Sequence, residues 1–284
     1  MMLIHEVKEL ATKVAIARSA GQRIGFVPTM GALHQGHLSL IEIAKQNCDF
    51  VVVSVFVNPL QFGQGEDFEK YPRSIGQDAR LLTDTGVDIL FAPSAGAVYP
   101  KDHPVPQVSA GELGEVFEGK SRPGHFDGML TVVNRLFDLV RPDVVVFGQK
   151  DAQQVALVKQ MLDQQIKSGS REPIRLLIGQ TIRDSAGLAL SSRNKNLSSA
   201  ELVIAQSIPR ALFAGASSGF EVASILEAAR AQLHPEAKLD YLELVEATSF
   251  LPVTQIGSSP VRLIIAAKVG ETRLIDNVLI DRKS

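Results

Sequence analysis

The chain has 284 residues, of which 45% are hydrophobic and 21% are charged, and its formal net charge is -2. This composition is typical of a globular protein with a large buried core, and it argues against a disordered, fibrous or membrane-spanning chain. The small negative charge also argues against a protein whose main partner is a nucleic acid, since such proteins usually carry an excess of basic residues.

Residues 1–20 predict an amphipathic helix rather than an export signal. Charged residues such as Lys8, Glu9 and Lys13 interrupt the apolar stretch that a signal peptide requires. The only cysteine, Cys48, has no partner for an intrachain disulfide, as is common in a reducing compartment. No apolar run approaches the roughly 18 residues that span a bilayer. We therefore expect a cytoplasmic protein with no membrane partner.

Short apolar strands alternate with helical segments over the first part of the chain. The expected strands are Ile24–Pro28, Phe50–Val57, Asp88–Ala92, Val144–Phe147 and Ile174–Ile178. The expected helices are Gly36–Gln46, Gln77–Thr85, Gly128–Val140 and Asp151–Gln165. Runs such as FVVVSVFV are apolar on both faces, as in strands that helices cover on both sides of a parallel sheet. This alternation predicts an α/β, Rossmann-like core.

The pattern changes beyond Ser198. Two helical segments are followed by three strand-like runs, and these elements are Ala200–Ala214, Phe220–Leu233, Tyr241–Glu246, Arg262–Val269 and Thr272–Ile280. Helices followed by an antiparallel meander predict a separate α+β unit. We therefore expect a Rossmann-like nucleotide-binding domain at residues 1–178 and a smaller C-terminal α+β domain at residues 179–284.

The segment PTMGALHQGH follows the first expected strand and leads into the first expected helix. Ligands of open α/β sheets gather at the carboxyl ends of strands, and the N–H groups at a helix N-terminus favour phosphate. His34 and His37 are three residues apart and share a helix face, while Gly36 lets a bulky group approach the backbone. A polyphosphate site is the favoured interpretation. A capping histidine and a zinc site are the alternatives, although no further Cys or His lies nearby at ligand spacing.

Polar residues follow two other expected strands. Asn58 and Gln61 can both donate and accept hydrogen bonds, which suits a substrate with hydroxyl and carboxylate groups; alternatively, Asn58 and Pro59 only end the strand. In FGQKDAQQ, Lys150 can place a charge on phosphate and Gln154 can face the cleft. Asp151 in the same segment fits a helix cap equally well.

The remaining candidates are weaker. Ser191–Lys195 offers hydroxyls and cations in the segment between the two halves, and it could close over ATP or be a solvated loop before a capping box at Ser198 and Glu201. Residues 120–126 could add charge or form an exposed loop. Asp78 could help to hold magnesium, although a surface carboxylate is the more common explanation for one acidic residue.

Six segments, PTMGALHQGH, NPLQFG, YPR, RPGHFDG, FGQKDAQQ and SSRN, occur in this order along nearly the whole chain. Together they resemble the pantothenate synthetase family, also called the pantoate–β-alanine ligases. The H-x-G-H element alone would indicate only the wider nucleotidyltransferase superfamily. The resemblance implies an ATP-dependent condensation of (R)-pantoate with β-alanine through a pantoyl adenylate, with release of AMP and pyrophosphate.

The same resemblance implies roles for individual residues. His37, His34 and Lys150 would be catalytic, Gln61, Gln154 and Asn58 would bind the small substrates, and Asp78 is a candidate metal ligand. The implied ATP contacts are Met30, Gly31, Ala32, Leu33, His34, Gln35, Gly36, His37, Gly148, Gln149, Lys150, Asp151, Ile182, Leu190, Ser191, Ser192 and Arg193. ATP and Mg2+ would be the cofactors, the C-terminal domain would act as a lid, and the protein would be a homodimer.

Two local departures from the family pattern stand out. The family commonly has an acidic residue where Gln149 stands and an aromatic residue where Ala152 stands. The acidic run that often precedes the third helix is reduced to Asp78, which leaves a direct protein ligand for magnesium open.

Other functions remain as alternatives. They are a nucleotidyltransferase acting on a phosphorylated acceptor and a non-catalytic nucleotide-binding module. An aminoacyl-tRNA synthetase is disfavoured, because SSRNK is a poor substitute for its lysine-rich signature.

Overall fold

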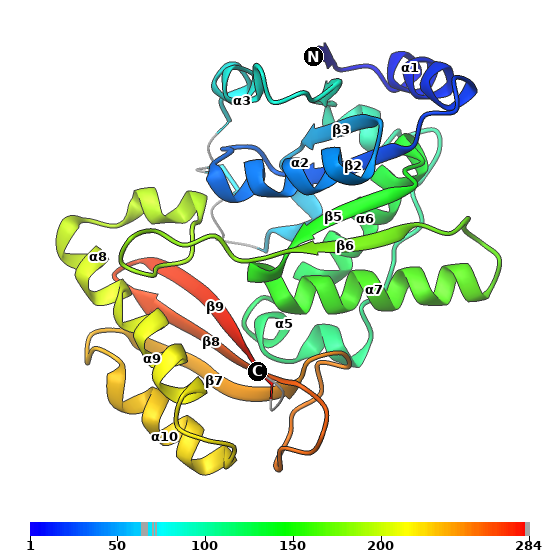
Figure 1. The fold of residues 1–284 in the computed structure, drawn as a ribbon. Helices are drawn as coiled ribbons and strands as arrows, with labels where there is room; N and C mark the ends of the chain where they lie inside the picture. The colour runs from blue at the N-terminus through cyan, green and yellow to red at the C-terminus, as the bar shows by residue number, and fades with distance from the viewer. Residues whose placement is uncertain (64–67, 70, 72, 282–284) are drawn as a thin grey trace. The chain divides into compact units, whose positions relative to one another are not determined.

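A computed structural model describes residues 1–63, 68–69, 71 and 73–281. The chain divides into two compact units (Figure 1). The first unit comprises residues 1–149 and 157–180, and the second comprises residues 150–156 and 181–284. Pro72, at the centre of the YPR segment, lies outside the described residues.

The first unit contains, among its described residues, a six-stranded parallel sheet in the order β1-β4-β3-β2-β5-β6. Its strands are β1 (Met2–Ile4), β2 (Ile24–Thr29), β3 (Phe50–Val55), β4 (Ile89–Phe91), β5 (Val144–Gly148) and β6 (Arg175–Gly179). Most residues of β2 to β5 are buried, which agrees with strands that are covered on both faces.

Helices connect these strands and cover the sheet. They are α1 (Val7–Ser19), α2 (Gln35–Asn47), α3 (Ile75–Leu82), α4 (Ala95–Val98), α5 (Glu118–Ser121), α6 (His125–Val140) and α7 (Ala152–Lys167), with short 3-10 turns η1 (Pro59–Gln61), η2 (Glu112–Glu115) and η3 (Gln149–Asp151). Leu40 and Ile41 of α2 pack in one apolar cluster with Val27. Phe26, the neighbour of Val27 on β2, instead contacts Phe137 of α6, with ring centroids 6.4 Å apart. Successive strand residues point to opposite faces, so α2 and α6 cover opposite sides of the sheet.

The centre of the sheet contains a topological switch point. Strands β2 and β5 are neighbours, and Gly25 pairs with Val144. The chain leaves β2 through α2 to reach β3 on one side, and it leaves β5 through α7 to reach β6 on the other side. Ligands of open parallel sheets bind at the carboxyl ends of the strands at such a point. The loops after β2 and β5 are therefore the first places to look for a site.

The second unit contains an antiparallel sheet of β7 (Lys238–Glu246), β8 (Val261–Val269) and β9 (Thr272–Ile280). Its helices are α8 (Ser199–Ala205), α9 (Ser207–Ala216) and α10 (Val222–Gln232), with the turn η4 (Ser192–Asn196). Leu263 and Ile265 of β8 pack in one core with Leu212 of α9 and Ile225 of α10. The helices therefore cover one face of this sheet, and Arg262 and Ile264 of β8 point to the other face.

The expected fold class is confirmed, with two local corrections. Residues 1–20 do not form one helix, because Met2–Ile4 form strand β1, which pairs with β4 before α1 begins. The helix expected at Ala200–Ala214 is two helices, α8 and α9. Pro209 explains the break, since it has no N–H group to donate to the carbonyl four residues earlier. The boundary expected between residues 178 and 179 and the lid role stay predictions.

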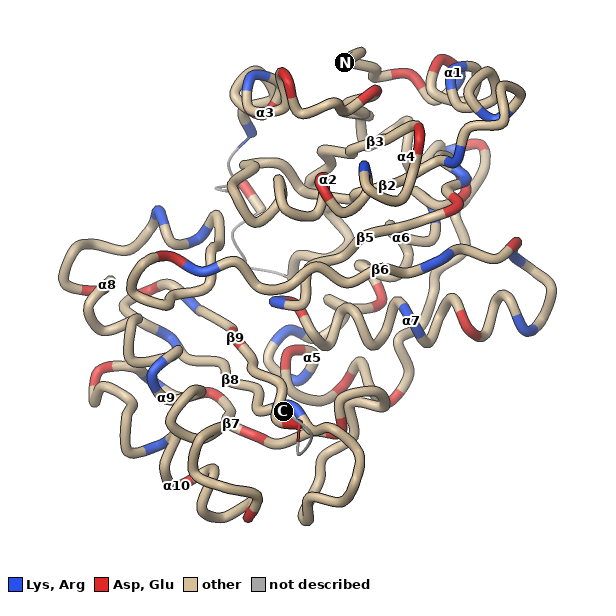
Figure 2. The backbone as a smooth tube through the Cα atoms, viewed as in Figure 1, with Lys and Arg blue, Asp and Glu red and all other residues tan. Residues whose placement is uncertain are grey.

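Charges are mixed along the chain rather than collected by sign. Figure 2 shows basic and acidic residues interspersed along the backbone of both units, in keeping with the formal net charge of -2. In the described part of the chain, no helix is both long enough and apolar enough to cross a membrane.

The packing of α6 against η1 generates a stability prediction. A Cβ atom at Gly128 would collide with the Leu60 carbonyl oxygen and lie 2.8 Å from the backbone nitrogen of Gln61. We expect Gly128→Ala to lower the free energy of unfolding by about 1–3 kcal/mol, because overpacking forces the backbone to move. Chemical denaturation checks this. The control is Gly76→Ala on α3, where a Cβ would meet no atom within 4 Å. The control should be neutral or stabilising by up to about 1 kcal/mol, and equal effects of the two substitutions would contradict the prediction.

Candidate active site

The loop between β2 and α2 changes direction sharply at Gly31 and Ala32. Their φ angles are +86° and +52°, in the region that L side chains rarely adopt. A Cβ at Gly31 would also lie only 2.8 Å from a methyl carbon of Val55. Thr29 supports the turn, because its hydroxyl donates to the Ser54 carbonyl at 2.6 Å and accepts from the Gly31 N–H at 3.1 Å. Gly31 is therefore required by both conformation and space.

Asp78 holds the next two residues of this loop. Its two carboxylate oxygens accept hydrogen bonds from the backbone N–H groups of Ala32 at 3.1 Å and Leu33 at 2.8 Å. The side chain is only 3% exposed, so the interpretation as a surface carboxylate is wrong. A carboxylate that accepts two N–H groups is a strong anchor for the backbone. These contacts favour a structural role for Asp78 in the loop, and its role as a metal ligand stays a prediction.

His34 and His37 form a reciprocal cap at the start of α2. The Nδ1 atom of His34 accepts from the Gly36 N–H at 3.1 Å, and the Nδ1 atom of His37 accepts from the His34 N–H at 3.2 Å. The two rings are close, with centroids 4.2 Å apart. The capping role considered from the sequence is therefore real, and it coexists with the proposed binding role.

The capping bonds decide which ring nitrogen can donate. A nitrogen that accepts a hydrogen bond carries no proton, so the neutral form of each imidazole has its N–H at Nε2. His34 and His37 are both partly exposed. The start of α2 thus combines two imidazole N–H donors with a helix N-terminus, which carries partial positive charge. This arrangement suits an anion such as a polyphosphate.

The zinc alternative finds no support in this loop. Among the described residues, no group of three or more His, Cys, Asp or Glu side chains could hold a metal ion. A protein zinc site normally needs at least three such ligands. The contacts of the histidine pair are those of a helix cap, and its binding of an anion stays a prediction.

Gln61 lies beside the loop, and Asn58 supports it. The side-chain nitrogen of Gln61 is 2.7 Å from the sulfur of Met30, and Gln61 is 7% exposed. The Asn58 nitrogen donates to the Gln61 side-chain oxygen at 3.3 Å and to the Gly128 carbonyl at 3.0 Å. The Asn58 oxygen accepts from the Tyr99 hydroxyl at 2.8 Å. Asn58 is fully engaged as a scaffold, and its direct contact with a substrate stays a prediction.

Two residues that lie near Gln61 had only a weak signal in the sequence. The Nδ1 atom of His125 lies 2.8 Å from the Gln61 carbonyl oxygen, and Arg122 donates to the same oxygen at 3.4 Å. The RPGHFDG segment was the available signal for them. Nothing in the sequence pointed to Tyr99, whose pKa burial raises, so that its hydroxyl keeps the proton that it donates to Asn58.

Residues 150–156, which end η3 and begin α7, belong to the second unit and include Lys150, Asp151 and Gln154. The Lys150 side chain is 20% exposed, and its ammonium lies 3.6 Å from a carboxylate oxygen of Asp151. The Lys150 carbonyl accepts a hydrogen bond from the Asn277 side chain at 3.0 Å. Asp151 therefore pairs with its neighbour here, and Gln154 is partly exposed on the first turn of α7.

The segment that carries Ile182 and Leu190 folds back on itself. The Leu190 N–H donates to the Ile182 carbonyl at 2.9 Å, and Arg183 pairs with Ala189 in an antiparallel bridge. Ser191 then caps the turn η4 by accepting from the Arg193 N–H at 3.3 Å. This backbone places Ile182 and Leu190 next to each other, as two residues of one binding segment would be.

The predicted ATP contacts are thus ordered within each unit. The first unit places Met30 against Gln61 and joins His34 to His37. In the second unit, a backbone hydrogen bond links Ile182 to Leu190, and a hydrogen bond to its carbonyl holds the backbone of Lys150. That both sets act on one ATP molecule stays a prediction, as does the direct contact of Gly148, Gln149, Ser192 and Arg193 with ATP.

Comparison with known proteins gives a consistent result over the whole chain. The family model for pantoate–β-alanine ligase matches residues 2–279. A pantothenate synthetase from Nocardioides sp. is 47% identical, and the alignment covers 98% of this chain and 84% of that protein. Another from Acinetobacter baylyi is 44% identical, with 98% of each chain covered.

Solved structures agree in fold as well as in sequence. The crystal structure of pantothenate synthetase from Thermus thermophilus has a TM-score of 0.90 and 42% identity, and the match covers 99% of this chain and 100% of that one. Pantoate–β-alanine ligase from Francisella tularensis, crystallised with β,γ-ATP and β-alanine, has a TM-score of 0.79 and 38% identity, with 98% of this chain and 97% of that chain covered. The chain belongs to the pantoate–β-alanine ligase family.

Proposed function

We propose that this enzyme condenses (R)-pantoate with β-alanine to form pantothenate, using ATP and releasing AMP and pyrophosphate through a pantoyl adenylate. The observation that carries the proposal is the start of α2, where His34 and His37 cap the helix through Nδ1 and their ring centroids lie 4.2 Å apart at a helix N-terminus. The family match supports the choice of substrates, and the Francisella structure contains an ATP species and β-alanine.

The first step joins two anions. An oxygen of the pantoate carboxylate attacks the α-phosphorus of ATP, and the bond from that phosphorus to pyrophosphate breaks. Donors arranged in advance around the developing charge stabilise such a transition state most effectively. In the proposal, His34 and His37 donate from Nε2 to phosphate oxygens. Lys150 and Arg193 supply further positive charge, and both side chains are at least partly exposed.

The second step forms the amide. The β-alanine amine attacks the acyl carbon of the adenylate, the bond to AMP breaks, and the amine loses its proton. Gln61 would contact both pantoate and β-alanine, while Gln154 would contact pantoate, with Asn58 in support. Alignment of reacting groups contributes up to about 7–11 kcal/mol in favourable cases. The rigid support of Gln61 by Asn58 therefore suits a positioning role.

Mg2+ would enter with ATP. The described residues include no group of three or more candidate ligands for a metal ion, so we propose that triphosphate oxygens hold it. There it would neutralise charge on the nucleotide. The two oxygens of Asp78 each accept a loop N–H, and the proposal gives that residue the task of shaping the loop.

The proposal also includes a cytoplasmic homodimer whose C-terminal unit acts as a lid. An acyl adenylate hydrolyses readily in water, and exclusion of solvent from the intermediate gives a physical reason for closure. The family resemblance supports the dimer.

The proposed reaction predicts pyrophosphate–ATP exchange that depends on pantoate. The purified protein with Mg2+ should incorporate labelled pyrophosphate into ATP when D-pantoate is present and β-alanine is absent, because adenylate formation is reversible. Exchange without any added acid, or no exchange by a folded protein that binds ATP, would favour a nucleotidyltransferase or a binding module instead.

If the imidazole rings donate to phosphate, the replacement of one ring should lower the exchange rate without unfolding the protein. We expect His37→Gln to slow pantoate-dependent exchange about 100-fold or more, because the substitution removes the imidazole ring and its Nε2–H donor. A glutamine at this helix position can still accept from the backbone of the capping residue, so the free energy of unfolding should change by less than about 1 kcal/mol. The matched control is His103→Gln at an exposed loop residue. A wild-type exchange rate in His37→Gln would remove His37 from the site.

The two glutamines predict a change in substrate requirement. Gln61→Ala and Gln154→Ala should each raise the concentration of pantoate needed for half-maximal exchange by about tenfold, which corresponds to the loss of one or two hydrogen bonds. ATP binding, measured by calorimetry, should stay within about twofold of wild type. Gln46→Ala, on an exposed part of α2, is the control. An unchanged pantoate dependence would show that the glutamine concerned does not bind pantoate.

A further inference from the structure

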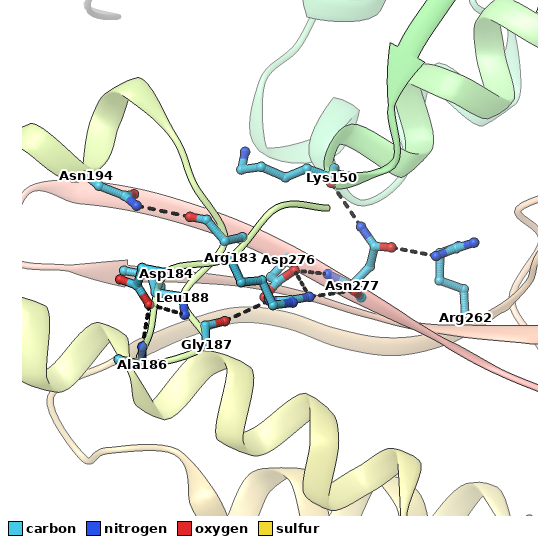
Figure 3. Close-up of polar contacts among 11 residues, drawn as sticks. Lys150, Arg183, Asp184, Ala186, Gly187, Leu188, Asn194, Arg262, Asp276 and Asn277 are labelled. Atoms are coloured by element: carbon cyan, nitrogen blue, oxygen red, sulfur yellow. Dashed lines mark hydrogen bonds and ion pairs between the residues drawn. The ribbon is translucent and has the colours of Figure 1, made fainter. Parts of the chain in front are cut away.

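Two adjacent residues of β9, Asp276 and Asn277, are polar and almost completely buried. They are 3% and 4% exposed. Successive strand residues point to opposite faces of a sheet, so the two side chains serve different neighbours. The contacts that Figure 3 draws for the two residues lie within the second unit.

Asp276 holds the segment that leads to Ser191–Arg193. Its carboxylate forms two ion-paired hydrogen bonds with Arg183, at 2.5 and 2.9 Å. Arg183 also donates to the Gly187 carbonyl at 3.0 Å, within the turn that brings Leu190 back to Ile182. Burial raises the pKa of the Asp276 carboxyl, and the Arg183 guanidinium acts against that effect. The pair fixes the base of the folded segment on β9.

Asn277 holds the backbone at Lys150 on the opposite face. Its side-chain nitrogen donates to the Lys150 carbonyl oxygen at 3.0 Å, and its side-chain oxygen accepts from Arg262 at 2.7 Å. The register of the sheet explains the second contact. Asn277 pairs with Ile264, and Arg262 lies two residues away on the same face of β8, at a diagonal position.

Arg262 fixes the orientation of the Asn277 amide. A guanidinium only donates hydrogen bonds, so the amide oxygen must face Arg262 and the amide nitrogen must face Lys150. Arg262 is 8% exposed, and burial lowers its pKa to about 10, which leaves it charged at neutral pH. A buried charge whose hydrogen bond is lost is costly, so this orientation is strongly enforced.

We propose that Asn277 is a positioning residue that fixes the main chain of Lys150 and thereby aims its ammonium group at the phosphates of ATP. This inference rests on the proposed function, in which Lys150 acts on ATP. Lys150 lies in the short turn η3, and its flexible side chain begins from a backbone held by one strand of a sheet. Sites anchored on strands are more precise than sites on loops. Because β9 holds the Ile182–Arg193 segment through Asp276 as well, one strand orders two of the predicted ATP-binding segments.

The test uses Asn277→Asp in the full-length protein. Aspartate has nearly the same shape and still accepts from Arg262, but it presents an oxygen instead of an N–H to the Lys150 carbonyl. We expect kcat for pantoate-dependent pyrophosphate–ATP exchange to fall about 10- to 100-fold, the loss typical of a reacting group misplaced by about 1 Å. The pantoate concentration for half-maximal exchange should change by less than about twofold. If this variant fails to fold, Asn277→Ser, whose side chain is too short to reach Lys150, replaces it.

A second background separates positioning from a merely structural role. Lys150→Ala keeps the carbonyl group that Asn277 contacts but removes the ammonium. Asn277→Asp should therefore change the free energy of unfolding equally in both backgrounds. In Lys150→Ala, however, it should lower the residual exchange rate by less than about twofold, because no ammonium remains to be positioned. The rate is measured at enzyme concentrations that make the Lys150→Ala activity detectable.

The control is Asp240→Asn on β7, the far strand of the same sheet. It weakens an exposed contact with Arg273 in the same sheet and should leave exchange within about twofold of wild type. Two results would overturn this inference while leaving the proposed function intact. The first is a wild-type protein that shows pantoate-dependent exchange and an Asn277→Asp variant that exchanges at the same rate. The second is an equal loss of rate from Asn277→Asp with Lys150 present and with Lys150→Ala. A wild-type protein without pantoate-dependent exchange would overturn the proposed function and this inference with it.

Discussion

The loop from β2 to α2 must bury backbone N–H groups while it turns through a conformation with positive φ, and the Asp78 carboxylate makes this possible. Ala32 and Leu33 are buried, and an N–H group that is buried without a partner destabilises a fold by roughly the value of a lost hydrogen bond or more. Asp78 accepts both N–H groups. The position of α2, and therefore of His34 and His37, depends on this contact between α3 and the loop.

Features that depend on residues close together in the sequence could be predicted from the sequence. The strands of the parallel sheet are apolar on both faces, and the H-x-G-H segment follows one of them, so both the fold class and the location of this segment at a strand end were foreseeable. The three-residue strand β1 was not, because Met2–Ile4 are too short to show alternation and their pairing with β4 depends on residues far along the chain. The break between α8 and α9 had a signal, Pro209, but its effect on the expected helix was underestimated.

Most of the residues that support the candidate site could not be predicted from the sequence. Asp78 and Leu33 are separated by 45 residues, Tyr99 and Asn58 by 41, and Asn277 and Lys150 by 127. No local periodicity reports such contacts, since only the tertiary fold brings the partners together. The residues whose side chains suit binding or catalysis were therefore easier to predict than the residues that hold them in place. For the same reason nothing in the sequence indicated that the Asp78 carboxylate accepts two backbone N–H groups.

The cap at the start of α2 links the local fold to proton chemistry. Each Nδ1 atom of His34 and His37 accepts a backbone N–H group, and an imidazolium ion has no nitrogen left that can accept. A second proton on either ring would therefore detach that ring from the helix end. In the proposed site, neutral histidines would donate to phosphate and keep α2 capped, whereas protonated histidines would carry full positive charge and no longer cap the helix. Proton transfer through either ring is consequently coupled to the fraying of the first turn of α2.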